Sequence, residues 1–388
     1  MRFKCRFLKK KFLLLLITLG IGSALYANDE LKSLADSLRR MIDEKPLFIQ
    51  QKEQRINRIK CLLKGSGLTL EQKYKINFQL CNEYKKFVVD SAIHYVDQNL
   101  EIARKLNNRD LKNQSSLQLS LLYSMCGRYR DAELILEKIK TSELSKDLLS
   151  VYYETYSRFW EYYSITANSR YGKQRAVYQD SLLSLLDQTS FDYKLSRAYY
   201  YGGRDSIKAK TVLQELLDTE EVGTPHYAMI THAYASFCWH QKKMDERKKY
   251  LMMSAIAIAD IRNATRETAS LQALALIQYE EKNLSDAFKF TQSAIDDVVS
   301  SGIHFRAMEI YKFYSIINTA YQTEEARSKS NLITFLISTS IILFLLVLLV
   351  ICIYIQMRKI LKIKRALVQS NDKLLRLIEI VYSLKNQC

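Results

Sequence analysis

Residues 117–140 read LQLSLLYSMCGRYRDAELILEKIK, with a glycine near the middle of two apolar-patterned segments. Apolar residues recur three and four positions apart on both sides of Gly127, which is typical of two amphipathic helices. Gly127 permits the turn between them, because glycine adopts a positive φ without steric penalty. Ala132 places a small side chain near the start of the second helix, so that the two backbones can approach closely. Leu119 and Leu136 are then expected to fill the groove between neighbouring pairs.

The same register fits other parts of the chain, which indicates a repeated unit. Ala92, Ala209 and Ala287 take the small position, whereas Arg247 stands there in one loosely fitting copy. Tetratricopeptide (TPR) repeats are helix pairs with this pattern and a length of about 34 residues. The other segments in register are 76–106, 229–256 and 270–296, with two further pairs predicted at 148–187 and 193–217.

The composition favours helix nearly throughout. The 388 residues include only 2 Pro and 10 Gly, so few residues interrupt a helix. We therefore predict an all-α chain in which about five to seven pairs stack into a right-handed, TPR-like helical-repeat solenoid. The concave face of such a stack is a binding surface, so we expect a protein or peptide partner there.

The N-terminus is typical of a secretory signal peptide. Basic residues precede the apolar stretch Phe12–Ile21, which is too short to span a membrane comfortably. Small residues follow, so residues 1–27 are predicted to be the signal, with cleavage after Ala24 or Ala27 left open. Cys5 precedes the apolar stretch and is therefore not a lipoprotein cysteine. An uncleaved signal anchor is the alternative.

A second apolar segment, residues 332–355, reads LITFLISTSIILFLLVLLVICIYI and holds no charged residue over 24 positions. That length is enough for one tilted membrane-spanning helix. Residues 356–365 carry five Lys or Arg and no acid, so the positive-inside rule places the C-terminus in the cytoplasm. The sequence thus predicts a single-pass protein with an exported domain at 28–331 and a cytoplasmic tail at 356–388.

The formal charge of +17 is concentrated beside the two apolar segments. Residues 1–11 contain six Lys or Arg and no acid, and residues 356–388 contain eight against two acids. The other 344 residues therefore carry only +5. Charge in these places flanks a membrane rather than forming a nucleic-acid footprint, so we expect this chain to bind no nucleic acid.

The exported domain carries no recognisable catalytic, cofactor-binding or metal-binding motif. His226, His232 and His240 lie near Cys238, but no two of these histidines have the four-residue spacing of a helical metal site. A Gly-rich phosphate loop and a nucleophile elbow are also missing from the sequence. We therefore predict a protein that is not an enzyme and has no catalytic residues, cofactor or metal.

Two features of the exported domain leave alternatives open. The tyrosine-rich stretches at 152–163 and 199–201 either pack between helices or form an aromatic surface for a ligand, and packing is the simpler interpretation. Export permits disulfides, whereas apolar helical settings favour buried free thiols, and both remain open for Cys61, Cys81, Cys126 and Cys238.

The tail carries a heptad pattern in which seven of eight successive a and d positions are apolar. This favours a parallel coiled coil and a homodimer through Ile360–Leu384. An amphipathic helix on the anionic inner leaflet is the alternative. No histidine follows His304, so the tail lacks the phospho-accepting residue of a sensor kinase. The heptad positions are Ile360, Ile363, Leu367, Ser370, Leu374, Leu377, Val381 and Leu384.

The whole layout resembles a family of Gram-negative, membrane-anchored TPR regulators. The resemblance is carried by KKMDERKKYLMMSAIAIADIRNATRETASLQALA (Lys242–Ala275) and by LVQSNDKLLRLIEIVYSLKN (Leu367–Asn386). It implies a bacterial inner-membrane protein with a periplasmic N-terminal domain. It also implies that a cytoplasmic effector region would begin near Cys388, so either the chain is truncated or a partner supplies the output.

Two functions follow as expectations. In the first, a partner binds the repeat array outside the inner membrane, and the membrane helix relays this event to a cytoplasmic output in a regulatory or signalling role. In the second, the protein is a membrane-tethered scaffold for envelope or secretion proteins, and the tail is only an anchor.

Overall fold

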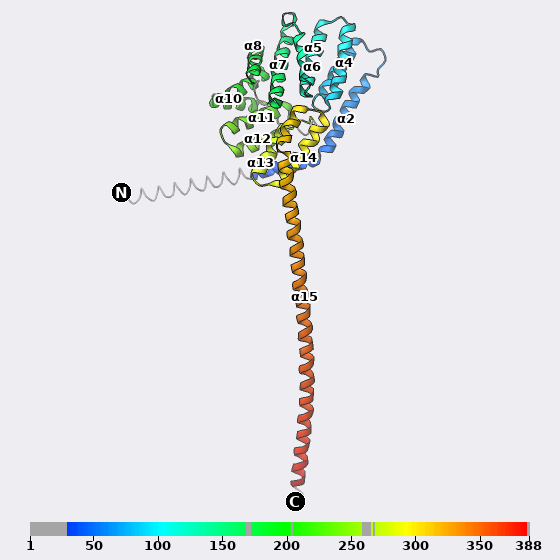
Figure 1. The fold of residues 1–388 in the computed structure, drawn as a ribbon, viewed down its shortest axis with the longest axis vertical. Helices are drawn as coiled ribbons and strands as arrows, with labels where there is room; N and C mark the ends of the chain where they lie inside the picture. The colour runs from blue at the N-terminus through cyan, green and yellow to red at the C-terminus, as the bar shows by residue number, and fades with distance from the viewer. Residues whose placement is uncertain (1–28, 168–171, 203–204, 258–264, 267, 386–388) are drawn as a thin grey trace, which may run out of the picture. The chain divides into compact units, whose positions relative to one another are not determined.

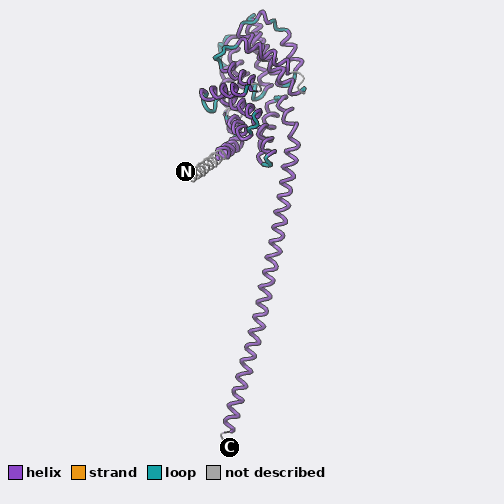
Figure 2. The backbone as a smooth tube through the Cα atoms, turned by 90° about the vertical axis from the view of Figure 1, so that its left-hand side faces the viewer, coloured by secondary structure: helices purple, strands orange, loops and turns teal. Residues whose placement is uncertain are grey.

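The computed structural model describes residues 29–385 except 168–171, 203–204, 258–264 and 267, and the described part contains helices and no strand (Figures 1 and 2). The predicted signal peptide lies outside the described residues. The chain divides into two compact units, Met1–Thr319 and Ala320–Cys388. A helix through residues 29–43 is followed by α2 (Lys45–Leu62), α3 (Leu70–Tyr84), α4 (Val89–Lys105), α5 (Arg109–Met125), α6 (Tyr129–Glu137), a 3-10 turn (Thr141–Glu143), α7 (Lys146–Thr166), α8 (Gly172–Leu185), α9 (Phe191–Gly202), α10 (Ser206–Thr219), α11 (Pro225–His240), α12 (Met244–Ile256), α13 (Ala269–Glu280), α14 (Leu284–Ser301) and α15 (His304–Lys385).

Consecutive helices pack in the predicted pairs, so the repeat is confirmed. The pairs are α3 with α4, α5 with α6, α7 with α8, α9 with α10, α11 with α12, and α13 with α14. Four of the predicted segments agree with these pairs to within about five residues, including the two around α7 to α10. The segments predicted at 76–106 and 117–140 start late, because α3 begins at Leu70 and α5 at Arg109.

The small positions are buried as predicted. Ala92, Ala132, Ala209 and Ala287 are each 0 % exposed, because the partner helix lies directly against them. At Ala132 the approach is close enough for the Ser120 hydroxyl of α5 to donate a hydrogen bond of 3.0 Å to its carbonyl oxygen. In α12 the Arg247 guanidinium instead lies 4.1 Å from the ring centroid of Trp239, which explains how a large residue is accommodated there.

Short polar residues begin several of these helices. The Thr69 hydroxyl accepts a hydrogen bond from the Gln72 amide, and the Gln72 side chain accepts one from the Thr69 amide, which makes a capping box at α3. The side chains of Asn108 and Thr224 cap α5 and α11 by accepting a hydrogen bond from the Leu111 amide and the Tyr227 amide, with Pro225 at the first turn of α11. The turn from α5 to α6 uses Gly127 at φ +79°, as the sequence predicts.

The array bends so that its first helices reach its last ones. Leu38 and Met41, from the helix at 29–43, lie in one buried cluster with residues of α12, α13, α14 and α15. The Lys45 ammonium at the start of α2 lies 2.7 Å from the Asp297 carboxylate of α14, which is 2 % exposed. In Figure 1 the yellow α14 accordingly lies between the blue α2 and the green helices α11 and α12.

The last helix, α15, begins inside the first unit and continues through the second. Ile310, Phe313 and Ile317 are buried against the helix at 29–43 and against α13 and α14. Beyond the first unit, the helix contains a charge-poor window of mean hydropathy 3.1 with none of its residues buried. By length and composition this helix can cross a membrane.

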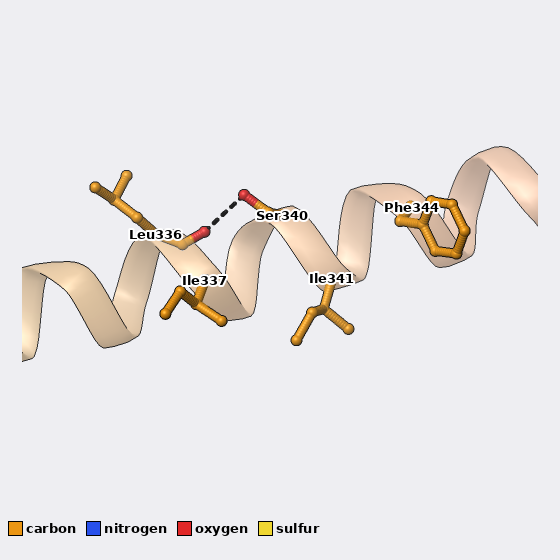
Figure 3. A pocket seen from close by; sticks show the side chains of 5 residues that line it. All are labelled: Leu336, Ile337, Ser340, Ile341 and Phe344. Atoms are coloured by element: carbon orange, nitrogen blue, oxygen red, sulfur yellow. Dashed lines mark hydrogen bonds between the residues drawn. The ribbon is translucent and has the colours of Figure 1, made fainter.

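Hydroxyl groups within the apolar segment of α15 are satisfied by the helix itself. The Ser340 hydroxyl donates a hydrogen bond of 2.8 Å to the Leu336 carbonyl oxygen, beside Ile337, Ile341 and Phe344 (Figure 3). Thr339 donates in the same way to Phe335 at 3.0 Å. Such bonds pair the hydroxyl donors of all the Ser and Thr residues in this segment, which suits a helix surrounded by lipid.

Candidate functional site

The candidate site is the surface of α5, α7 and α9 that faces the start of α15, here named the inner face. Its apolar part is filled by the turn between α14 and α15. Ile303 and Phe305 are 2 % and 3 % exposed and belong to the same buried cluster as Leu122 and Met125 of α5. The Phe305 ring is stacked on the Tyr162 ring of α7, with centroids 4.0 Å apart and planes 10° apart.

The His304 side chain, in the residue before Phe305, lies directly against Gly127. A Cβ atom at Gly127 would lie 2.8 Å from Nδ1 of His304. Gly127 therefore serves two purposes, because it turns the chain between α5 and α6 and also leaves room for the turn before α15. The sequence predicts only the first purpose.

Arg266 ties this turn to the first repeats. Its Nη1 donates hydrogen bonds of 2.7 Å to the Phe87 carbonyl oxygen and 2.9 Å to the Ser300 carbonyl oxygen. Its guanidinium also lies 4.1 Å from the Phe87 ring centroid. Burial lowers the pKa of Arg266, although the group stays charged at any physiological pH. Arg266 thus joins the loop before α13, the end of α14 and the turn between α3 and α4.

The polar part of the inner face is a cluster of charged groups. Glu161 of α7 accepts a hydrogen bond of 2.9 Å from Nη1 of Arg158 and lies 3.3 Å from Nη2 of Arg175 of α8. Burial acts to raise the pKa of Glu161, but the charges of Arg158 and Arg175 hold it below its usual value. Burial raises the pKa of the Tyr199 hydroxyl of α9 to about 12, and the charges of Arg158, Glu161, Arg175 and Arg306 act on it as well. The polar cluster therefore consists of Arg158, Glu161, Arg175, Tyr199 and Arg306.

Burial divides the tyrosine-rich stretches into two groups. Tyr152 and Tyr156 are buried, and Tyr156 is stacked on Tyr178 of α8 with centroids 4.4 Å apart, so they pack between helices. Tyr199 and Tyr200 of α9 instead remain 46 % and 41 % exposed. Their side chains are available to a bound partner.

A hollow lies where α2, α3 and α4 meet. It has a volume of about 410 Å³, and the Tyr84 and Tyr95 rings in its wall are stacked with centroids 5.9 Å apart. The sequence gives no sign of this hollow, because its residues come from three helices without a shared motif. The lining residues are Lys60, Tyr84, Asp90, Ser91, His94 and Tyr95.

The histidines and cysteines take structural positions. The His226 ring is stacked on Phe191 at 3.9 Å and lies 3.6 Å from Glu220. No group of three or more His, Cys, Asp or Glu is placed to hold a metal ion within the described residues. Burial raises the pKa of the Cys81 thiol to about 11. The thiols are free at each cysteine that the structure describes, namely Cys61, Cys81, Cys126, Cys238 and Cys352.

Comparison with known proteins agrees with this architecture. The chain matches the SusR N-terminal TPR domain over residues 42–312, well over half of its length. The match includes the six helix pairs and the first turns of α15, and therefore the whole inner face. No curated protein matches the chain. A TPR domain of this kind indicates a non-catalytic, protein-binding and regulator-type protein. The chain belongs to the SusR N-terminal TPR domain family.

Proposed function

We propose that this protein is a membrane-anchored TPR regulator that binds a protein or peptide partner at the inner face and relays binding to the cytoplasm. One observation supports this most directly. The helix that contains the apolar segment begins at His304, inside the array, with Phe305 packed in the inner face itself. A change at the inner face therefore acts on the first turns of α15.

The proposed topology follows from charge and hydropathy. Residues 332–355 form the span, residues 28–331 lie in the periplasm, and residues 356–388 lie in the cytoplasm of a bacterial cell. The support is the basic flank after the span, since Lys and Arg close to a membrane helix stay on the cytoplasmic side. Residues 1–27 are proposed to be removed as the signal.

The proposed partner surface is the part of the inner face that the chain leaves open. Tyr199 and Tyr200 offer exposed aromatic rings beside Arg158 and Glu161. Aromatic and arginine side chains supply most of the binding energy in many protein interfaces. A photo-crosslinking amino acid at Tyr199 is expected to form an adduct with the partner in cells. The matched control at Val299, which is 67 % exposed on α14, is expected to form none.

The proposed assembly is a homodimer through Ile360–Leu384. The described apolar heptad residues from Ile360 to Val381 are all more than half exposed in a single chain, and their spacing fits a parallel coiled coil. In membranes, Leu374→Cys at an a position is expected to form an intermolecular disulfide, and Asp372→Cys on the opposite side of the helix is expected to form much less. Equal cross-linking of the two variants would argue against a coiled coil.

Exchange of the membrane anchor distinguishes a protein that relays binding to the cytoplasm from a membrane-tethered scaffold. In cells that lack the gene, the native chain and a chain whose residues 332–388 are replaced by an unrelated single-pass anchor are compared by their transcript profiles. Relay predicts that only the native chain restores the wild-type profile. Full restoration by the exchanged chain would reject relay and favour the membrane-tethered scaffold.

A further inference from the structure

The segment where α14 passes into α15 packs against the second and third helix pairs. Its two buried side chains, Ile303 and Phe305, lie in one cluster with residues of α5 and α7. The turn belongs to the last repeat, whereas Leu122 and Tyr162 belong to the second and third pairs. The apolar part of the inner face is therefore covered by the array's own chain and not by solvent.

Arg266 fastens the chain just before this turn. Its guanidinium donates hydrogen bonds to the carbonyl oxygens of Phe87 and Ser300. Ser300 lies three residues before Ile303, so one arginine side chain ties the entry to the turn to the first repeats.

We propose that Ile303–Arg306 is a latch, which occupies the inner face until a peptide segment of similar chemistry replaces it. This inference rests on the proposed function, because it concerns the partner surface of the same inner face. The slot beside Tyr162 accepts an aromatic ring, whereas the Arg306 guanidinium is paired with Glu309 of its own helix at 2.7 Å. The partner segment accordingly presents an aromatic residue. Its binding frees the first turns of α15.

The test uses the full chain in lipid nanodiscs and a peptide copy of the latch, SSGIHFRAME, which is residues 300–309. Phe305→Ala empties the slot, so the peptide is expected to bind this variant about tenfold or more tightly than it binds the native chain. The same peptide with alanine in place of phenylalanine is expected to lose this preference. Equal binding of the peptide to both chains would overturn the latch.

Two controls show whether Phe305→Ala acts locally. Hydrogen exchange at residues 300–306 is expected to accelerate in this variant, while α10 keeps its native exchange. Phe290→Ala, which removes a ring that is 0 % exposed in another cluster, is expected to accelerate exchange in α13 and α14 without creating peptide binding. Arg266→Gln loosens the turn without emptying the slot, and faster exchange at 300–306 is again expected. An unchanged rate there would overturn the role of Arg266 in the latch.

A final measurement links the latch to the tail. Phe305→Ala is expected to change the yield of the Leu374→Cys disulfide by about twofold or more relative to the native background, since free and docked turns hold α15 differently. An unchanged disulfide yield together with accelerated exchange at 300–306 would show that the latch is not coupled to the tail, without contradicting partner binding at the inner face. Absence of a photo-crosslinked adduct at Tyr199 would instead contradict the proposed function.

Discussion

Arg39 and Asp286, 247 positions apart in the sequence, form a two-pronged ion pair between the helix at 29–43 and α14. Nε of Arg39 donates to Oδ1 of Asp286 at 2.7 Å, and Nη2 donates to Oδ2 at 2.5 Å. This geometry is the strong form of an arginine–carboxylate contact. The pair joins the first helix of the array to the last complete repeat, so the array is closed by its own ends.

Breaking this pair is expected to destabilise the domain. Arg39→Gln leaves the Asp286 side chain, which is 8 % exposed, without its cation. Because the Arg39 side chain is itself 37 % exposed, we expect a loss of only about 1–2 kcal/mol in the free energy of unfolding, measured by urea denaturation. Asp36→Asn, which removes the exposed contact of the same arginine, is expected to change this free energy by less than about 0.5 kcal/mol. Equal effects of the two variants would show that the ends are not joined through Asp286.

The same pair makes stability depend on pH at the acid end. Burial acts to raise the pKa of Asp286, but Arg39 lowers it below the ordinary value of 3.8. The folded state therefore binds the proton less readily than the unfolded state. The contribution of the pair is fully present above pH 3.8 and is lost as the pH falls through the lower folded value. The difference in stability between the native chain and Arg39→Gln is expected to shrink below pH 3.8, and a constant difference across pH 2–5 would contradict this assignment.

The small position of the repeat is expected to tolerate no large residue. Ala132→Leu forces α5 and α6 apart and disrupts the hydrogen bond from Ser120, so we expect a loss of about 1–3 kcal/mol in the free energy of unfolding. Glu137→Leu introduces the same side chain at an exposed position of α6 and is expected to be nearly neutral. Thermal unfolding followed by circular dichroism measures both variants. A neutral Ala132→Leu would mean that α5 and α6 are not closely packed.

Gly127 is expected to couple energetically to His304. Gly127→Ala is expected to lower the free energy of unfolding for two reasons. The alanine must adopt a positive φ, which costs about 1–2 kcal/mol, and its Cβ atom clashes with the His304 ring. His304→Ala removes only the clash, so the double variant is expected to recover about 1 kcal/mol relative to the sum of the single variants. The double-mutant cycle is read from urea denaturation of the full chain. Strict additivity would show that the turn before α15 does not lie on Gly127.

The repeat is predictable from sequence because it depends on the spacing of small and apolar residues that are close together in the chain. Ala92, Ala132 and Ala287 recur in a fixed register with apolar neighbours, and each is buried where the register places it. This pattern specifies how each helix meets its neighbour in the chain.

The inner face is less predictable from sequence, because its contacts join residues of distant repeats. The small rotation between each pair and the next determines which of these residues come together. The stacked rings of Phe305 and Tyr162 are 143 positions apart in the sequence, and Arg266 is 179 positions from its hydrogen-bond partner Phe87. No periodic signal marks such contacts, and the sequence gives only the aromatic richness around Tyr162. The exposed tyrosines at 199 and 200 differ from the buried ones at 152 and 156 for the same reason.

Labelling of single cysteines measures the topology of the chain. Two variants each keep one of the seven cysteines and carry serine at the other six; the cysteine kept is Cys61, which is exposed on α2, or Cys388 at the end of the tail. Cells stripped of their outer membrane are treated with a membrane-impermeant maleimide, before and after lysis. We predict that Cys61 is labelled in intact cells and that Cys388 is labelled only after lysis. Labelling of both cysteines, or of neither, in intact cells would contradict a single-pass protein with its TPR domain outside the inner membrane.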